Sequence, residues 1–488
     1  MSGGRRSARW CLRPFGQPPI ELRTAFPHGI SVHHLKYDPS IESTLEMALS
    51  IRPPSPQGGV EPGEKWLKRH QWPALFFALI VATGMAFSFL WNPLLHHSPN
   101  WLTPPDLWST YRAAQYVIWG GEGQIYNNPA PFQTFPGIAI MLAPIAKLAG
   151  LWHLSEGFPV ALPRPSAWWL LDPVQLALGA TLLFPLDSIA RRLDVPTRRR
   201  IPLLALEAAL IWPSVVLWGH PEDAVSLTFA LYGVIALAER RWLRFASFFA
   251  LATVMQPLVL LILPMCLAYV PLKRWLLTGT VIVLPTVVTL IAPLAQEWSA
   301  TSRLLLRQPN YFANNHPTPW AAIAPVIDPA RTKLVDILKY VGSPHGRHHA
   351  EEVVMKVHTL PVVAAGPGRI VALVIACALG VAIKRLSPTW PQMVWAAALA
   401  LSLRCVFEPV MVPYYLLPGL ALALLVASRL NPVRFWVAAV AAVVCTLLSY
   451  RHVSEWQYYV TMVTPLALTL IAAWPGQRTL EFATSSNR

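Results

Sequence analysis

The chain has 488 residues, of which 54% are hydrophobic and only 13% are charged, and its mean hydropathy is +0.43. This composition leaves too little polar surface to cover a soluble globular protein and predicts an integral membrane protein. The net charge of +15 does not indicate nucleic-acid binding, because the Lys and Arg residues stand in short clusters between apolar runs. The five cysteines offer neither a disulfide framework nor a zinc site, since most of them fall inside apolar runs.

The N-terminal region does not read as a membrane segment. Residues 1–64 are rich in Pro, Gly, Ser and Arg and contain no apolar run, which predicts a disordered tail rather than a signal peptide. The cluster of Lys65, Lys68 and Arg69 stands before the apolar run 73–92 and places the N-terminus in the cytoplasm by the positive-inside rule.

Apolar runs of about 20 residues recur from Pro73 to Trp474 and predict an all-α, polytopic transmembrane bundle of roughly 10 to 12 membrane helices. If every basic cluster faces the cytoplasm, the runs alternate in direction, and both termini are cytoplasmic in a multi-pass protein of the plasma membrane. The predicted outward spans are 73–92, 203–219, 275–293, 391–410 and 434–450, and the inward spans are 166–187, 224–238, 369–384, 413–428 and 457–474.

Two segments do not fit as simple crossings. Residues 134–150, which contain Lys147, would break the alternation, so we expect a tilted, interfacial or re-entrant helix there. Residues 245–270 have basic residues on both sides and Gln256-Pro257 at the middle, which predicts two half-helices that enter and leave from the cytoplasm. Such backbone is tolerated only where protein or a water-filled cavity surrounds it. The Gln256 side chain either satisfies the carbonyls that the proline frees or contributes to a site.

These patterns predict five parts of the chain. They are a cytoplasmic tail at 1–64, a transmembrane module at 65–300 with a first outer loop at 93–133, a second outer loop at 301–368, a C-terminal transmembrane module at 369–476 and a cytoplasmic tail at 477–488. In the second loop, His345, His348, His349, Glu351 and Glu352 are close together, but their spacing matches no standard metal site. A solvated loop is the better interpretation, and no metal is predicted.

Asp106 follows two prolines in the first outer loop and opens a helical pattern. The spacing of Trp108, Tyr111, Gln115 and Ile118 predicts an amphipathic helix that lies on the membrane. Asp106 is then either an N-cap or a base that takes a proton from an acceptor hydroxyl. The residues alone leave both interpretations open.

His220, Glu222 and Asp223 stand in a short turn between two predicted spans. Pro221 followed by acids is ordinary chemistry for the start of a helix. Two acids and a histidine at the membrane boundary are also a candidate substrate-binding cluster. We favour the cluster, because a simple cap needs only one of the three.

Arg404 is predicted to lie inside a span, with Glu408 one turn further toward the outside. A charge at the membrane centre costs roughly 2.5 to 3.5 kcal/mol on insertion scales, so this pair calls for an explanation. It is either a structural ion pair at i and i+4 or a site in which Arg404 neutralises a phosphate and Glu408 orients it. We favour the second interpretation, with Tyr414 and Tyr415 lining the site.

The residues of the first outer loop resemble those of a known family. They are Asp106, Tyr111-Arg112, Gly120-Gly121, Ile125-Tyr126 and Phe135-Pro136, followed by a segment rich in Ala, Leu and Pro. In this order they resemble the bacterial GT-C glycosyltransferases that use polyprenyl-phosphate sugars, closest to the actinobacterial mannosyltransferases of glycosyltransferase family 87. The resemblance covers roughly residues 70–300. The chain departs from the family in Gly219-His220-Pro221-Glu222-Asp223, where the family usually has Gly-Gln and Asn, and in Gln256, where it often has a lysine.

The resemblance implies a GT-C-like fold with amphipathic loop helices on the outer face, and an inverting, metal-independent transfer that needs no cofactor. Asp106 would be the base, and Tyr111 and Arg112 belong to the same run and count as substrate-binding residues. Arg112, Arg404 and His220 are the candidates to neutralise the departing phosphate. The implied partners are a polyprenyl-phosphate sugar donor, with mannose favoured, a glycolipid or polysaccharide acceptor of the cell envelope, and membrane lipids.

Two other functions stay open. A transporter or flippase of a lipid-linked solute would also use Arg404, Glu408 and the broken segment at 245–270. Against it, the sequence has no detectable internal repeat and its first outer loop is large. A catalytically inactive scaffold for envelope assembly is the third interpretation.

Overall fold

A computed structural model of the chain describes residues 69–95, 104–126, 132–154, 167–311, 316–328, 335–341, 351–357, 362–386, 388–450 and 454–476. The tails predicted at 1–64 and 477–488 lie outside the described residues, as do Lys65, Lys68, His345, His348 and His349.

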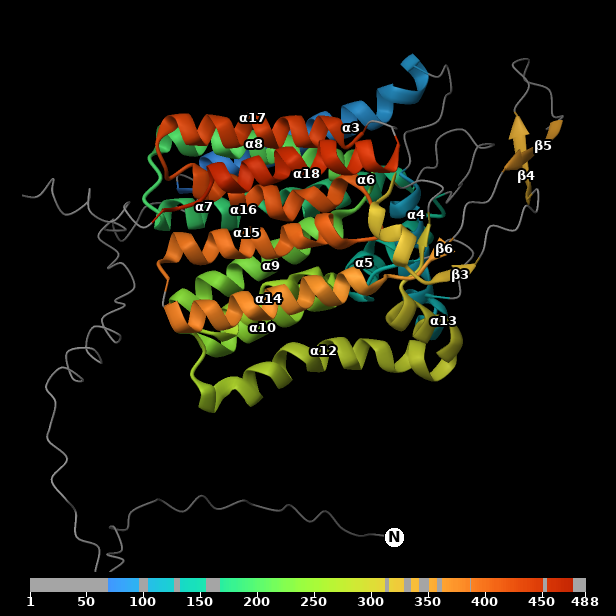
Figure 1. The fold of residues 1–488 in the computed structure, drawn as a ribbon. Coiled ribbons are helices and arrows are strands. Elements are labelled where there is room, and N and C mark those ends of the chain that lie inside the picture. The colour runs from blue at the N-terminus through green and yellow to red at the C-terminus, as the bar shows by residue number, and fades with distance from the viewer. Residues whose placement is uncertain are drawn as a thin grey trace, which may run out of the picture. The chain divides into compact units, whose positions relative to one another are not determined.

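The described part of the chain is built mostly of apolar helices that run side by side (Figure 1). The N-terminal helices are α3 (Gln71–Leu95), α4 (Pro105–Ile118), α5 (Gly137–Leu151), α6 (Trp168–Ala180), α7 (Leu183–Arg192), α8 (Thr197–Val216), α9 (Pro221–Ala238) and α10 (Trp242–Met255). They are followed by η2 (Pro257–Leu261), α11 (Leu263–Leu267), α12 (Trp275–Gln296) and α13 (Trp298–Ser302), and short 3-10 turns form η1 (Glu122–Gln124) and η3 (Leu272–Arg274). The C-terminal helices are α14 (Pro367–Leu386), α15 (Trp390–Phe407), η6 (Pro413–Leu416), α16 (Leu417–Ala427), α17 (Pro432–Leu448) and α18 (Glu455–Ala472).

Five helices of the described residues are long and apolar enough to cross a membrane. They are Gln71–Trp91, Trp168–Arg192, Pro221–Ala238, Leu272–Gln296 and Trp390–Phe407. Every span predicted from the sequence coincides with a helix or with two consecutive helices. The prediction of a helical membrane protein is therefore confirmed in its coarse form, and the total of roughly 10 to 12 membrane helices stays a prediction.

Helix α9 is the central element. Within the apolar stretch of α9 that could span a membrane, 83% of the residues are buried inside the protein. The corresponding share is 17% for α3 and 22% for α12. α9 packs against α10, α6 and α16, whereas α12 exposes side chains such as Leu276 and Val288. Exposed apolar side chains on the outer helices suit contact with lipid, and the first turn of α9 is among the best protected positions of the protein.

Arginines connect the helix ends at one end of the bundle, which we name the basic end. Arg192 at the end of α7 pairs with Glu239 after α9. Arg199 of α8 donates to the carbonyl of Leu430 beyond α16, and Arg434 of α17 donates to the last carbonyls of α18. Helix C-termini expose unpaired carbonyls with partial negative charge, which arginine donors stabilise. The basic clusters that the sequence assigns to one face thus share one end of the described helices.

The break predicted at Gln256 is confirmed. α10 ends at Met255, Gln256 is extended with φ −153° and ψ 122°, and η2 and α11 lead back toward the basic end. There Lys384, in the last turn of α14, donates to the carbonyl of Ala268 at 3.4 Å. Both ends of the predicted segment 245–270 therefore lie at the same end of the bundle.

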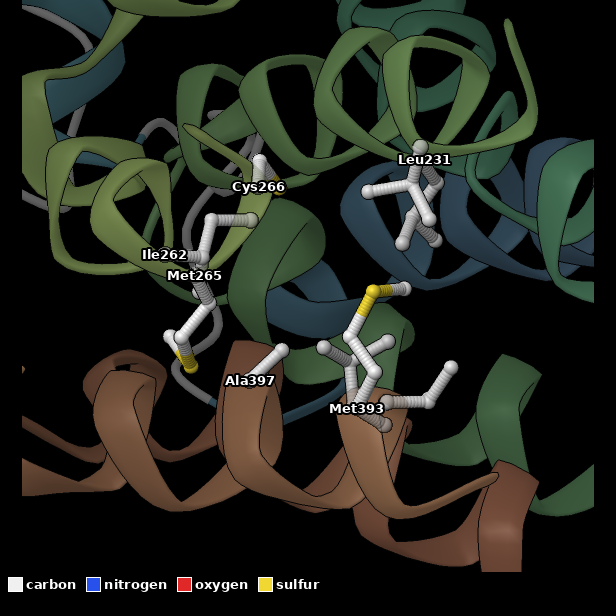
Figure 2. Close-up of a pocket in the computed structure, with 9 residues that line it drawn as sticks. Leu231, Ile262, Met265, Cys266, Met393 and Ala397 are labelled. Atoms are coloured by element: carbon white, nitrogen blue, oxygen red, sulfur yellow. The ribbon is translucent and has the colours of Figure 1, made fainter. Parts of the chain in front are cut away.

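Protein surrounds the return arm of this broken segment, as the prediction requires. Figure 2 shows Met393 of α15 reaching toward Leu231 of α9, beside Ile262, Met265 and Cys266 of the return arm. The apolar void between them is only about 10 Å³, about the size needed for one water molecule. The buried side chains of the return arm, those of Val259, Ile262, Met265 and Cys266, pack into the bundle.

Helix α4 forms where the sequence predicts it, and its predicted apolar face packs against protein. Tyr111 and Gln115, which belong to the predicted apolar face, are 3% and 1% exposed. α4 packs along α5, the helix that the sequence predicts to be tilted, interfacial or re-entrant. The pattern of α4 is amphipathic because its partner is another helix of the protein, and periodicity cannot distinguish this partner from lipid.

Short antiparallel strands, which the all-helical prediction omitted, occur in the second loop. β1 (Asn310–Tyr311) and β3 (Val326–Asp328) flank β6 (Val362–Val363), β2 (His316–Pro317) pairs with β7 (Val410–Met411), and β4 (Val335–Val341) pairs with β5 (Glu351–Val357). The β2 and β7 pair places His316 opposite Met411 and so ties the second loop to the segment after α15.

Asn431 provides a test of the packing at the basic end, because its side chain accepts a hydrogen bond from the Arg434 amide at 2.9 Å and caps α17. Asn431→Ala should lower the free energy of unfolding by about 1 kcal/mol, whereas Asn431→Asp should keep the cap. The apparent melting temperature in detergent measures this. Equal losses in the two variants would show that the cap does not stabilise α17.

Candidate functional site

The first turn of α4 sits directly on Gly219, in the turn between α8 and α9. Gly219 has a φ of +69°, and a Cβ at this position would come within 2.5 Å of the Leu107 Cβ and 2.8 Å of the Pro104 Cβ. Only glycine adopts this backbone conformation at no steric cost and leaves this room. The contact brings Asp106 of α4 against His220 at the start of α9.

His220 lies between two carboxylates. Its Nε2 is 2.8 Å from Asp106 Oδ2, and its Nδ1 makes a hydrogen bond to Glu222 Oε1. Ionised carboxylates only accept hydrogen bonds, so both ring nitrogens donate and the ring is an imidazolium. The Asp106 side chain is 45% exposed and the Glu222 side chain 3%. Asp106 is therefore the member of this bridge that a substrate can reach.

The interpretation of Asp106 as an N-cap is wrong. Pro104 is the N-cap residue of α4, and Asp106 lies in the first turn with its carboxylate directed to His220. α9 has the expected helix start, with Pro221 at its first position and Glu222 and Asp223 in its first turn. In addition, His220 at the N-cap position uses both ring nitrogens for Asp106 and Glu222.

The bridge changes the pKa of His220. Burial alone would lower the pKa, because it disfavours the charged ring, but the carboxylates of Glu222 and Asp106 outweigh burial and raise the pKa well above its ordinary value. The ring also stacks on Tyr414, with 3.8 Å between centroids and 22° between planes. The imidazolium is therefore the resident form at neutral pH.

Gln256 and Asp223 meet where the broken helix touches the first turn of α9. Gln256 Nε2 donates to Asp223 Oδ1 at 3.0 Å, and both side chains are buried. The carbonyl of Ala252, close to the break, accepts a hydrogen bond from Ser226 Oγ at 2.9 Å. The amide of Gln256 thus serves an acid and does not cap the carbonyls near the break.

Arg404 and Glu408 form the predicted ion pair, but Glu408 has a closer partner. Arg404 Nε is 3.5 Å from Glu408 Oε1, and Arg369 Nε is 2.7 Å from the same oxygen. The Arg404 guanidinium lies over the Tyr415 ring, with 3.2 Å from Cζ to the centroid, and interacts electrostatically with Asp223. Arg404 therefore connects the α15 side of the cluster to α9.

Aromatic rings close one side of the cluster. Tyr414 contacts Tyr415 edge to face at 5.0 Å and Trp218 at 5.7 Å, in addition to its stack on His220. Two further residues of the cluster, Trp218 and Arg369, are not marked by any pattern in their own sequence segments. Their contacts with Tyr414 and Glu408 reveal them.

Several buried polar atoms of this cluster have no hydrogen-bond partner among the described residues. They are Glu222 Oε2, Asp223 Oδ2, Arg404 Nη1 and Glu408 Oε2. Buried polar atoms nearly always have partners, and each unsatisfied one costs about 1–3 kcal/mol. Buried donors and acceptors that stay unpaired at this cost are typical of a site that binds a polar ligand.

Tyr111 and Arg112 are the predicted residues that the structure does not bring to the cluster. They lie five and six residues after Asp106, and at about 100° per residue their side chains leave α4 on other sides. Tyr111 is buried in the apolar core that α4 shares with α5. Arg112 Nη1 donates to Gln115 Oε1 at 3.4 Å, and its Cζ lies 5.6 Å from the Trp108 ring centre.

The other predicted site residues come together from segments far apart in the sequence. They are Asp106, His220, Glu222, Asp223, Gln256, Arg404, Glu408, Tyr414 and Tyr415. No model of a known protein family matches the chain, and no curated protein matches it. The geometry of these residues therefore carries the functional argument.

The contact at Gly219 can be tested against a matched glycine. Gly120 also has a positive φ, +72°, but a Cβ there would meet nothing within 4 Å. Gly120→Ala should cost about 1 kcal/mol for the backbone conformation alone, and Gly219→Ala should cost about 1–3 kcal/mol more because its Cβ collides with α4. Apparent melting temperatures measure the difference, and equal losses would refute the contact.

The raised pKa of His220 predicts how stability changes with pH. Its contribution is complete below the ordinary histidine pKa and is lost as the pH rises through the raised value in the folded protein. The melting temperature of the wild type should exceed that of His220→Gln at about pH 6, and the gap should shrink toward about pH 10. A gap that grows with pH would contradict the bridge.

Proposed function

We propose that the protein is a GT-C-type membrane glycosyltransferase. It transfers a sugar, with mannose favoured, from a polyprenyl-phosphate donor to a glycolipid or polysaccharide acceptor of the cell envelope. The observation that carries this proposal is the exposed carboxylate of Asp106, held by His220 at the end of α9 opposite the basic end. The class of donor rests on the sequence resemblance over residues 70–300.

The orientation follows from charge. If the basic end faces the cytoplasm, as the positive-inside rule favours, Asp106 works at the extracytoplasmic face of the plasma membrane. A donor with a lipid tail brings its phosphate and sugar to the ends of the membrane helices. An enzyme that uses such a lipid-linked donor at the ends of its membrane helices needs no nucleotide-binding domain.

In the proposed reaction, Asp106 is the general base. An acceptor hydroxyl attacks the anomeric carbon, its proton passes to Asp106, and the bond between that carbon and the phosphate oxygen breaks as polyprenyl phosphate leaves. The transition state is oxocarbenium-like, and the single displacement inverts the anomeric centre. His220 holds Oδ2 of Asp106, which leaves Oδ1 for the proton, and Glu222 holds the other side of the ring. A positioned general base contributes about 10²–10⁴-fold to the rate.

Arg404 is the proposed partner of the departing phosphate. Its Nη1 is buried and has no hydrogen-bond partner among the described residues, and its stack on Tyr415 fixes the plane of the guanidinium. An arginine fixed before the reaction stabilises developing negative charge without rearrangement. Arg112 has no role in this proposal, because its side chain leaves α4 on another side.

A cavity of about 410 Å³ beside α9 supports a lipid-linked substrate. Val225, Phe229 and Tyr232 line it from α9, with Leu178 and Phe184 opposite. The three α9 residues follow Glu222 at steps of three and four, which is the spacing of one helix face. The volume lies within the range of ligand pockets, and the apolar lining suits part of a lipid carrier.

Asp106→Asn tests the proposal. The variant keeps the size of the side chain but cannot act as a base, so sugar transfer from synthetic polyprenyl-phosphate mannose to membrane acceptors should fall at least about a hundredfold. Binding of the donor should persist. Transfer of radiolabelled sugar by the purified protein is the measurement.

Asp194→Asn is the matched control. Asp194 is an exposed acid in the turn between α7 and α8, at the basic end, and asparagine tolerates its positive φ of +57°. This variant should transfer sugar at the wild-type rate. Undiminished transfer by Asp106→Asn would remove Asp106 as the base, and no transfer by the wild type from mannose or arabinose donors would favour transport or an inactive scaffold.

A further inference from the structure

Arg369 approaches the cluster from a helix that the proposed mechanism does not use. It lies in the first turn of α14, and its Nε donates to Glu408 Oε1 at 2.7 Å. The preceding residue, Gly368, packs so closely on the carbonyl of Phe407 that a Cβ would not fit. The start of α14 therefore touches the end of α15, and the backbone itself brings Arg369 to Glu408.

Glu408 is shared between two guanidinium groups, and the sharing is unequal. The same oxygen that accepts from Arg369 at 2.7 Å is 3.5 Å from Arg404 Nε. Arg404 keeps one buried nitrogen, Nη1, without a hydrogen-bond partner in the described part of the chain. A carboxylate one turn further along the chain would be a natural partner for Arg404, but Oε1 of Glu408 accepts its shorter hydrogen bond from Arg369.

The charge balance of the cluster shows why the pairing of Glu408 with Arg369 matters for a bound phosphate. Among the described residues the cluster holds the carboxylates of Asp106, Glu222, Asp223 and Glu408 and the cations His220, Arg369 and Arg404. With Arg369 three cations face four carboxylates, and without it only two would, in a largely buried site where charges interact strongly. Arg369 therefore reduces the repulsion that the carboxylates exert on a phosphate.

We propose that Arg369 is a positioning residue that holds Glu408 and so leaves the Arg404 guanidinium available to the phosphate of a polyprenyl-phosphate substrate. This inference rests on the proposed function, which assigns the phosphate to Arg404. Arg369 need not touch the substrate. If its charge is removed, Glu408 pairs fully with Arg404 and takes the guanidinium away from the ligand.

The test measures binding of a synthetic polyprenyl phosphate without a sugar to the purified full-length protein in detergent, by native mass spectrometry. Arg369→Gln should bind about tenfold more weakly, which is the loss expected when one charged hydrogen bond is withdrawn. Arg303→Gln is the control, because Arg303 is exposed just after α13 and its removal costs the same unit of charge. This control should bind as the wild type does.

The double variant separates positioning from damage to the fold. In Arg369→Gln/Glu408→Gln the competing carboxylate is gone as well, so Arg404 is available again and the affinity should return to within about threefold of the wild type. A merely structural defect at Arg369 would not be repaired by a second substitution.

The outcomes distinguish this inference from the proposed function. Equal affinity of Arg369→Gln and the wild type would overturn the inference, as would a double variant as weak as the single one or a wild type that does not bind the carrier. If the wild type binds the carrier and the double variant shows the expected rescue, but no sugar is transferred, the glycosyltransferase proposal is refuted. The role of Arg369 in binding the phosphate then still holds.

Discussion

The site depends on the imidazole of His220, which joins two acids that are far apart in the chain. Asp106 is 114 residues away from His220 in sequence, and the bond between them attaches the first loop to the central helix α9. The buried carboxylate of Glu222 would be costly without a partner, and the charged ring pairs with it and with the more exposed carboxylate of Asp106. The bridge is possible because Gly219 lets α4 approach the turn before α9 without a side chain in between. The backbone contact at Gly219 and the ion pairs of His220 thus stabilise the same junction between α4 and α9.

The protein divides its charges between two ends of the bundle for different purposes. At the basic end, arginines satisfy the carbonyls of helix C-termini and pair with Asp187 and Glu239. At the opposite end, acids and cations alternate, and several of their buried atoms have no partner among the described residues. The first arrangement completes the hydrogen bonding of the backbone and needs no ligand. The second leaves bonding capacity unused, as in a site that binds a polar group.

Much of this was predictable because the signals are local. Hydropathy and basic clusters locate the spans, and Gln256-Pro257 marks the broken helix in its own segment. Acids and arginines inside apolar segments, such as Asp223 and Arg404, point to a site because their burial is costly. What escaped prediction depends on contacts between segments. Arg369 reads as an ordinary residue at the start of a helix, and Arg112 stands near Asp106 in sequence but leaves α4 on another side. The amphipathic pattern of α4 did not distinguish protein from lipid as its partner.

The anchored first turn of α4 also constrains the path by which substrates reach Asp106. α4 rests on Gly219, packs along α5 and is bonded to His220, so swinging the first loop away from the bundle would break the bridge and leave Asp106 without the cation of His220. Movement of the first loop would therefore cost the free energy of the Asp106–His220 ion pair. In the proposed reaction, substrates would therefore reach the exposed side of Asp106 while α4 stays in place as a fixed wall.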